Sequence, residues 1–454
     1  MPTLPSVEAP PEQPPCLVLA PFRGVRYAED RVSGLARVTS PPYDVIAADN
    51  ETRLMAADPH NVVRLILPRH PADQPGSPFQ DAAADLARWL ADGILIADPV
   101  PALYVYEQAV SGPVVLQRGL IGALGLVPYA AGVVQPHENV MPGPVAGRRQ
   151  LMEATQANLE PIFLLYQNGN GVATGLVDSV ADSRPPLAEA TTTDGLRHRL
   201  WAITDPAELA AIAADLAPRT ALIADGHHRY AAYLEVQRQL RDAGAGPGPW
   251  DRGLALLVDS AAYPPQVGAI HRVVYGLVPE TAARLASAAF GVRELPGGAA
   301  DVPGALAELA GACGCGPAFV LAGQGRAWLL SDPDPALLRA AVPDQPAELW
   351  QRVGGTVMSD LLFARLWGIT DDERSVRACH DPAEAVATAD GAAGDPDGSA
   401  SAIGLGVSTA VLCCPMSAAQ VYQVAALGRR VPRKSTSFGP KPRTGLVMRL
   451  FAEG

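Results

Sequence analysis

Short apolar runs and amphipathic segments alternate irregularly along this chain. Uninterrupted or alternating apolar runs predict β-strands, and apolar residues spaced three and four apart predict α-helices. The predicted strands cover residues 16–22, 62–67, 104–108, 117–127, 162–166, 221–224, 253–258, 410–414 and 445–451. The predicted helices cover residues 79–91, 149–158, 230–241, 281–290, 303–309, 335–341, 356–366 and 417–427, with a further one that begins at the Asp205 cap. Residues 135–149, which are rich in proline and glycine, predict a loop.

This mixture of elements predicts an α+β or mixed α/β fold. Residues 1–15 carry six prolines and predict a disordered leader. Residues 16–277 form a mixed α/β core in this interpretation, and residues 278–428 an Ala-rich region dominated by helices, with a linker at 392–401. The last region, residues 429–454, is a basic segment whose strand is expected to return to the core.

Composition excludes several classes of protein. Of the 454 residues, 48% are apolar and 18% charged, which allows a large buried core. No apolar run approaches the roughly 18 residues of a membrane span, and the N-terminus lacks the basic region of a secretory signal, so we expect a cytoplasmic protein. Six cysteines without a C-x-x-C pattern are expected to be free residues and not a disulfide framework. The net charge of −12 makes nucleic-acid binding unfavourable. The oligomeric state stays open.

Positive charge is nevertheless concentrated near the end of the chain. Residues 429–449 hold seven basic residues and no acidic one, and the rest of the chain carries 28 basic against 47 acidic residues. The only two lysines, Lys434 and Lys441, both lie here, and the hydroxyl residues Ser435 and Thr436 lie between them. Because a lysine presents a compact point charge, the segment is a candidate phosphate site.

A second candidate is the decapeptide at residues 221–230, in which an apolar strand ends in Asp225-Gly226 and a helix opens with His227-His228-Arg229. The glycine permits a tight turn close to a ligand, and a helix N-terminus favours anions. The arginine is a candidate phosphate ligand, and the two histidines are candidate acid/base groups or phosphate donors. Asp225 is the candidate Mg²⁺ ligand or base.

Two further clusters are weaker. Arg23 and Arg26 flank a glycine and are candidate phosphate ligands, while Asp44 follows a rigid Pro-Pro-Tyr turn and is a candidate base. His137 and Glu138 are adjacent in a predicted loop, a pairing suited to acid/base or metal chemistry but also common on ordinary surfaces.

Taken together, these motifs resemble the bacterial and archaeal domain-of-unknown-function family ten-fifteen. The matching pieces are residues 21–27, 41–46, 58–67, 137–148, 225–230, 271–272 and 432–446. The chain departs from the family at Val145-Ala146-Gly147, where a lysine and an aspartate usually precede the arginine, and at Ser437-Phe438, where an aromatic pair is usual. The Asp-Gly-His-His-Arg element also looks like the phosphate-binding turn of the ParB-like superfamily, which includes sulfiredoxin and free-serine kinases. This resemblance implies a ParB-like core and a phosphotransferase.

The resemblance further implies free L-serine as acceptor and pyrophosphate or a nucleotide as donor, with Mg²⁺ as cofactor. No Walker-type loop is present, which favours a small phosphate donor over the common kinds of ATP site. Two alternatives remain at this point: a nucleotide-binding switch or adaptor without turnover, and a metal-dependent phosphoesterase using His137, Glu138, His227 and His228. All three require that the distant motifs meet in one cleft.

Overall fold

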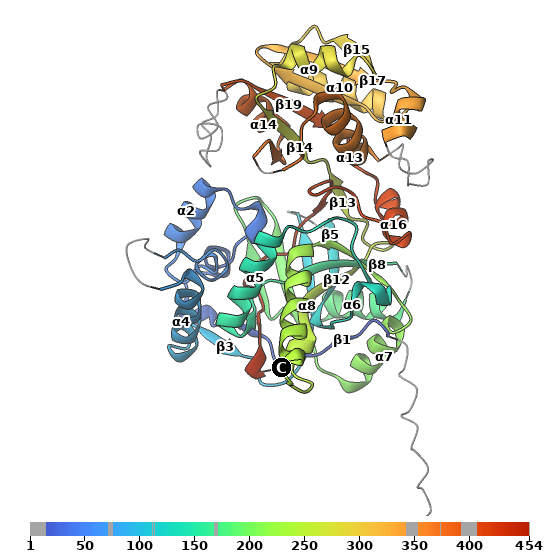
Figure 1. Ribbon diagram of the computed structural model, residues 1–454. Coiled ribbons are helices and arrows are strands. Elements are labelled where there is room, and N and C mark those ends of the chain that lie inside the picture. Colours follow the sequence, from blue (N-terminus) through green and yellow to red (C-terminus); the bar gives the residue numbers. More distant parts are fainter. Residues whose placement is uncertain are drawn as a thin grey trace, which may run out of the picture.

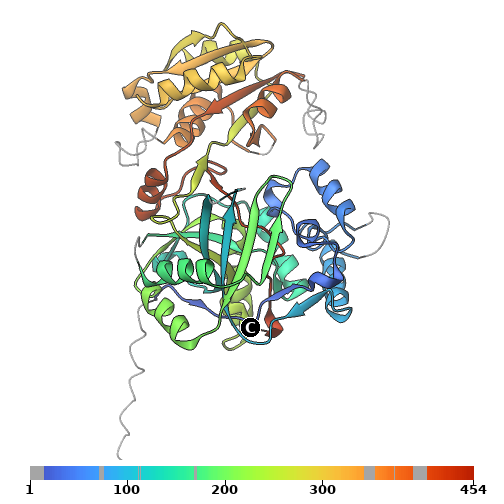
Figure 2. The ribbon, with the colours of Figure 1, turned by 180° about the vertical axis from the view of Figure 1, so that it is seen from behind.

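A nine-stranded mixed sheet organises the first part of the protein in the computed structural model (Figures 1 and 2). Its strand order is β6-β11-β8-β12-β5-β4-β10-β9, with β1 paired to β5. The strands are β1 (Leu19–Ala20), β4 (Leu103–Ala109), β5 (Val115–Gly125), β6 (Val134–Gln135), β8 (Ile162–Tyr166), β9 (Ala188–Thr191), β10 (Arg197–Ile203), β11 (Ala221–Asp225) and β12 (Arg252–Asp259). The structure describes residues 15–70, 76–110, 112, 114–167, 171–341, 353–372, 374–391 and 406–453.

Both faces of this sheet are buried, because successive side chains of a strand point to opposite faces. In β4, Tyr104 and Tyr106 pack into one hydrophobic core and Leu103 and Val105 into another. The surrounding helices supply the other halves of these cores. They are α1 (Leu35–Val38), α2 (Ala48–Ala57), α3 (Val63–Ile66), α4 (Pro78–Ala91), α5 (Pro142–Thr155), α6 (Val172–Ser183), α7 (Pro206–Leu216) and α8 (His227–Asp242).

A second sheet of six antiparallel strands lies above the first in Figure 1, in the order β15-β17-β16-β19-β14-β18. Its strands are β14 (His271–Tyr275), β15 (Gly291–Glu294), β16 (Phe319–Gly323), β17 (Arg326–Ser331), β18 (Val376–Cys379) and β19 (Ser408–Cys413). Its helices are α9 (Pro279–Ala286), α10 (Val302–Cys313), α11 (Pro335–Ala341), α13 (Gly354–Thr356), the π-helix η5 (Val357–Trp367) and α14 (Pro382–Ala389). Mostly helices were predicted in this region, and of the six strands only β19 matches a predicted strand.

Short elements connect the two sheets. β13 (Gln266–Gly268), which lies between them in Figure 1, pairs with β20 (Ser437–Gly439), and β21 (Arg449–Leu450) pairs with β7 (Ala157–Asn158). The chain thus returns to the core near its C-terminus, as predicted. The remaining elements are β2 (Val25–Tyr27), which pairs with β3 (Leu95–Ala97), the helix α16 (Ala418–Ala426), and the short helices η1 (Glu29–Arg31), η2 (Tyr43–Val45), η3 (Tyr129–Ala131), η4 (Pro249–Asp251) and η6 (Phe451–Glu453).

The structure corrects several local predictions. The apolar run at 62–67 is mostly helical, because α3 covers Val63–Ile66 and buries three of its apolar side chains. The predicted loop at 135–149 contains the first half of α5, which begins at Pro142, a residue favoured in the first helical turn. The predicted leader, except Pro15, and the predicted linker at 392–401 lie outside the described residues. Within the described residues, no helix is long and apolar enough to cross a membrane.

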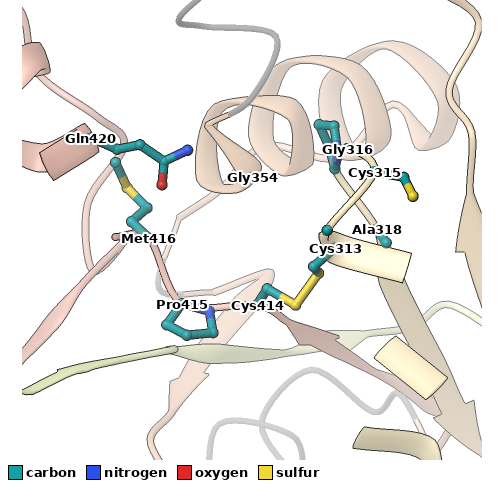
Figure 3. A pocket seen from close by; sticks show the side chains of 11 residues that line it. Cys313, Cys315, Gly316, Ala318, Gly354, Cys414, Pro415, Met416 and Gln420 are labelled. Atoms are coloured by element: carbon teal, nitrogen blue, oxygen red, sulfur yellow. A yellow bond between two sulfur atoms is a disulfide. The ribbon is translucent and has the colours of Figure 1, made fainter. Parts of the chain in front are cut away.

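The cysteines also differ from the prediction. Cys313, at the end of α10, and Cys414, just after β19, are joined by a disulfide across 101 residues (Figure 3). Cys16, Cys315, Cys379 and Cys413 are free, as predicted. The spacing of the cysteines does not indicate this pairing, because the two cysteines meet only through the packing of α10 against the second sheet.

Candidate functional site

The turn between β11 and α8 forms one wall of a polar cleft. Gly226 adopts a left-handed backbone, with φ of 92°, and a Cβ there would lie 2.9 Å from Ile162 Cγ2. The turn delivers Asp225 at the strand end and Arg229 in the first turn of the helix. The Arg229 guanidinium donates to Asp225 Oδ2 at 2.5 Å and to the Pro161 carbonyl at 2.6 Å. Glycine is therefore required where the motif predicted it.

The basic segment supplies the opposite wall of the same cleft. Lys441 Nζ lies 2.5 Å from Asp225 Oδ1 and 2.9 Å from Asp44 Oδ2, and Lys434 Nζ lies 3.7 Å from the same Asp44 oxygen. Lys434 itself has a positive φ of 53°, an uncommon conformation for a residue other than glycine. Three segments far apart in sequence thus meet around two carboxylates and three cations.

Electrostatics keep Asp44 and Lys441 charged. Burial opposes ionisation of Asp44, but the charges of Lys441, Lys434 and Arg229 outweigh it, so the pKa of Asp44 is well below its usual range. Burial would likewise lower the pKa of Lys441, but the neighbouring Asp225 and Asp44 carboxylates raise it overall. Asp44 is therefore a poor proton acceptor, and Lys441 stays cationic.

His137, His227 and His228 are neutral, and they mainly form hydrogen bonds that hold neighbouring groups in place. His137 is fully buried; its Nδ1 donates to the Ile223 carbonyl at 2.8 Å, so its Nε2 accepts from the Thr436 hydroxyl at 2.7 Å. Burial lowers the pKa of His137 to about 4 and that of His228 to about 4. His227 is also buried, and burial lowers its pKa well below the usual value. His137 thus lies behind the residues that line the cleft and holds the Thr436 hydroxyl, and its catalytic role stays a prediction.

The two other histidines accept hydrogen bonds from the predicted His-Glu loop. His228 Nε2 accepts from the Met141 N–H at 3.0 Å, and His227 Nε2 from the His137 N–H at 3.4 Å. The other ring nitrogen of His227, Nδ1, lies 3.5 Å from Glu138 Oε1. His227 and His228 line the cleft, but these bonds engage the ring nitrogen that a general base would need.

Glu138 is the group best suited to proton transfer. Burial raises its pKa to about 7, with Asp225 and Asp44 adding to that rise and Lys434 and Lys441 opposing it. Its Oε2 atom is buried and has no hydrogen-bond partner among the described residues, and the same is true of Asp44 Oδ1. Such unpaired buried acceptors require a ligand, a cation or water as partner.

The unpaired oxygen of Asp44 also fits Mg²⁺, which commonly takes one or two carboxylates together with substrate phosphates. Asp225, the predicted metal ligand, is less suited, because its two oxygens already contact Lys441 and Arg229. Within the described residues, no group of three or more His, Cys, Asp or Glu side chains is arranged to hold a metal ion.

Three predicted phosphate ligands lie elsewhere. Arg26 forms an ion pair with Asp98 at 2.6 Å, and Arg23 Nε donates to the Asp98 carbonyl at 3.0 Å. Asp98 directly follows β3, the strand that pairs with β2, so both arginines are held there and do not line the cleft. Ser435 donates its hydroxyl to the Pro432 carbonyl at 2.7 Å and does not line the cleft.

Sequence reasoning missed two contributors. His380, just after β18, lines the cleft, but nothing in its surrounding sequence marked it. Arg272 is 1% exposed and donates to the carbonyls of Arg433 and Lys434 at 3.0 and 2.8 Å. It therefore fixes the backbone that carries Lys434, and the adjacent His271-Arg272 motif was its only signal.

The cleft is almost closed, with a cavity of about 20 Å³, enough for one water molecule. Another cavity of about 340 Å³ lies beside the disulfide (Figure 3), but none of its lining residues is charged.

Several solved structures are similar to this chain. A free serine kinase in complex with AMP is 13% identical, with a TM-score of 0.32 and coverage of 74% of this chain and 93% of that one. SbnI with a C-terminal truncation from Staphylococcus aureus is 11% identical, with a TM-score of 0.34 and coverage of 73% and 87%. A conserved hypothetical protein from Pyrococcus furiosus is 13% identical, with a TM-score of 0.34 and coverage of 74% and 97%.

Comparison with curated proteins gives no match. The model of one family, described as a protein of unknown function (DUF1015), matches residues 19–349. That range is more than half of the chain and contains most of the motifs on which the resemblance rested. The chain therefore belongs to the DUF1015 family.

Proposed function

We propose that this protein transfers a phosphoryl group from a small donor to the hydroxyl of a small metabolite, with free L-serine as the leading acceptor. The observation that carries the proposal is the convergence of Lys434 and Lys441 on Asp44 and Asp225, beside the N-terminus of α8. Clustered cations at a helix N-terminus bind phosphate, and the carboxylates hold those cations in place before the donor arrives.

The proposed roles follow from the contacts. Lys441, Lys434 and the α8 N-terminus bind the donor phosphates, and Arg229 keeps Asp225 in position. Glu138 accepts the proton of the acceptor hydroxyl. The hydroxyl oxygen bonds to phosphorus as the bond between phosphorus and the leaving oxygen breaks. Mg²⁺, when bound at the unpaired oxygen of Asp44, would neutralise phosphate charge.

The proposal includes a fold and a domain arrangement. The nine-stranded sheet and its helices, within residues 16–277, would be the ParB-like core. Residues 278–428 would form the second region, and residues 429–454 the segment that completes the site. Pyrophosphate and nucleotides are both candidate donors.

The test is an assay of the full chain with Mg²⁺, L-serine and pyrophosphate, ADP or ATP, with phosphoserine detected by mass spectrometry. Lys434→Met should lower the rate at least a hundredfold, because a cation that stabilises transferring phosphate is lost. Arg429→Met, which removes an exposed neighbouring cation, should leave the rate within twofold.

Two results would count against the proposal. The first is a folded protein that forms no phosphoserine with any donor; tight nucleotide binding in that case would support a non-catalytic switch. The second is an active Lys434→Met variant, which would place the chemistry elsewhere. Circular dichroism of each variant confirms that the comparison is between folded proteins.

A further inference from the structure

A second, larger cavity adjoins the candidate site. It has a volume of about 430 Å³ and lies between the π-helix η5, the loop that follows Glu138, and the chain that precedes Lys434. Its polar walls include Thr356, Ser359, Asp360, Asp371, Arg430 and Arg433. Two segments therefore border both cavities: residues 138–141 and residues 430–434.

Two opposite charges in this cavity have no ionic partner within the described part of the chain. Asp360, on η5, makes no hydrogen bond or ion pair, and burial raises its pKa. Arg430 contacts only the face of the Tyr129 ring, 5.0 Å from its centroid. In contrast, Arg433 and Asp371 neutralise each other at 3.0 Å, and Ser359 donates to the second Asp371 oxygen.

A third group in the cavity is also unsatisfied. Thr356 is 3% exposed, and its Oγ1 has no hydrogen-bond partner among the described residues. A buried hydroxyl without a partner is costly unless a ligand or water supplies one. Its neighbour η5 is a π-helix, a rare conformation that occurs frequently at functional sites.

We propose that this cavity binds the zwitterion of a free α-amino acid, with the ammonium group at Asp360 and the carboxylate at Arg430. One molecule with both charges satisfies both unpaired side chains, whereas a simple anion or cation satisfies only one. Thr356 supplies a further hydrogen bond to the ligand. As the acceptor subsite of the phosphoryl transfer, the cavity rests on the proposed function; as a binding site, it does not.

The volume and the position of the cavity agree with this role. A cavity of about 430 Å³ lies within the usual range for small-ligand sites, whereas the neighbouring cleft has room for about one water molecule. The backbone that separates the two cavities includes the bridge between Glu138 and Val431. Glu138, the proposed base, therefore lies at the boundary between acceptor and donor.

Calorimetry of the full-length protein tests the assignment with three probes: L-serine, ethanolamine, which lacks the carboxylate, and 3-hydroxypropionate, which lacks the ammonium group. The native protein should bind L-serine at least tenfold more tightly than either analogue. The Asp360→Asn variant should bind L-serine at least tenfold more weakly than the native protein does, and with the same affinity as 3-hydroxypropionate. The Arg430→Met variant should bind L-serine with the same affinity as ethanolamine.

Matched controls remove charges of the same sign outside the cavity. Asp92→Asn and Arg429→Met both change exposed side chains and should bind L-serine within twofold of the native protein. Unchanged L-serine affinity in Asp360→Asn and Arg430→Met overturns the proposal, and so does a native protein that binds no L-serine.

The same variants separate this proposal from the proposed function. If L-serine binds and the two variants abolish binding, but no donor gives phosphoserine, the binding site stands and the phosphoryl transfer falls. If phosphoserine forms with an unchanged KM for serine in Asp360→Asn and Arg430→Met, the transfer stands and the amino-acid site falls.

Discussion

Replacement of Gly226 by alanine tests the geometry of the phosphate turn directly. The residue has φ of 92°, a region that costs an L-amino acid about 1–2 kcal/mol. The new Cβ would lie 2.9 Å from Ile162 Cγ2 and 3.1 Å from Arg229 Nε. Ile162 is fully buried, and the Arg229 guanidinium is fixed by two hydrogen bonds, so neither neighbour is free to move away.

Such overpacking costs about 1–3 kcal/mol, so Gly226→Ala should lower the free energy of unfolding by about 2–5 kcal/mol. Gly226→Asn separates the two contributions, because asparagine tolerates the left-handed backbone but still places a Cβ against Ile162. It should be less destabilising than alanine, and still clearly less stable than the native protein.

Gly147→Ala is the matched control. Gly147 lies inside α5, and a Cβ there would meet nothing within 4 Å. The same substitution should therefore stabilise the protein, by about 0.5–1 kcal/mol, because alanine favours the helix interior. Urea and thermal denaturation measure both effects. Equal changes in the two variants, or an unchanged Gly226→Ala protein, would refute the account of the turn.

Three further predictions follow from the site and the disulfide. If Glu138 is the base, kcat/KM should fall about tenfold per pH unit below the Glu138 pKa of about 7 and level off above it. Glu138→Gln should remove this pH dependence. A flat pH profile in the native enzyme would exclude Glu138 as the base. Arg272→Met should weaken pyrophosphate binding at least tenfold with little change in circular dichroism, because the carbonyls of Arg433 and Lys434 lose their donors. Unchanged binding would show that the Lys434 backbone keeps its conformation without Arg272. Cys313→Ser should cost about 2–4 kcal/mol of stability under oxidising conditions, and a reductant should destabilise only the native protein in denaturation experiments; a native protein insensitive to reductant would contradict the bond with Cys414.

Local patterns predicted those parts of the fold that short-range physics determines. The apolar patterns in residues 104–108 and 117–127 predicted the strands β4 and β5, and the Asp205-Pro206 start predicted α7, where Asp205 accepts from two backbone N–H groups. Apart from β19, which the run at 410–414 predicted, the strands of the second sheet were missed because they are flanked by Ala-rich helices. Residues 62–67 form a helix because tertiary packing overrode their β-branched composition.

The site divides in the same way. Asp225, Gly226 and Arg229 were identifiable because a turn, a helix start and a charge coincide within five residues. The two lysines were identifiable because the chain has no others. His380 and the supporting role of His137 were not, since both depend on which strands become neighbours in the folded protein.

The ion pair between Asp44 and Lys441 joins residues 397 positions apart. During translation, the nine-stranded sheet is therefore exposed to the cell long before the residues that close its cleft leave the ribosome. Until then Asp44 and Asp225 lack the lysine that neutralises them, and two like charges repel each other in an incomplete pocket. Nascent chains stalled before residue 430 should accordingly acquire protease resistance in the sheet but not in the turn, so that ligand binding develops only as the last step of maturation.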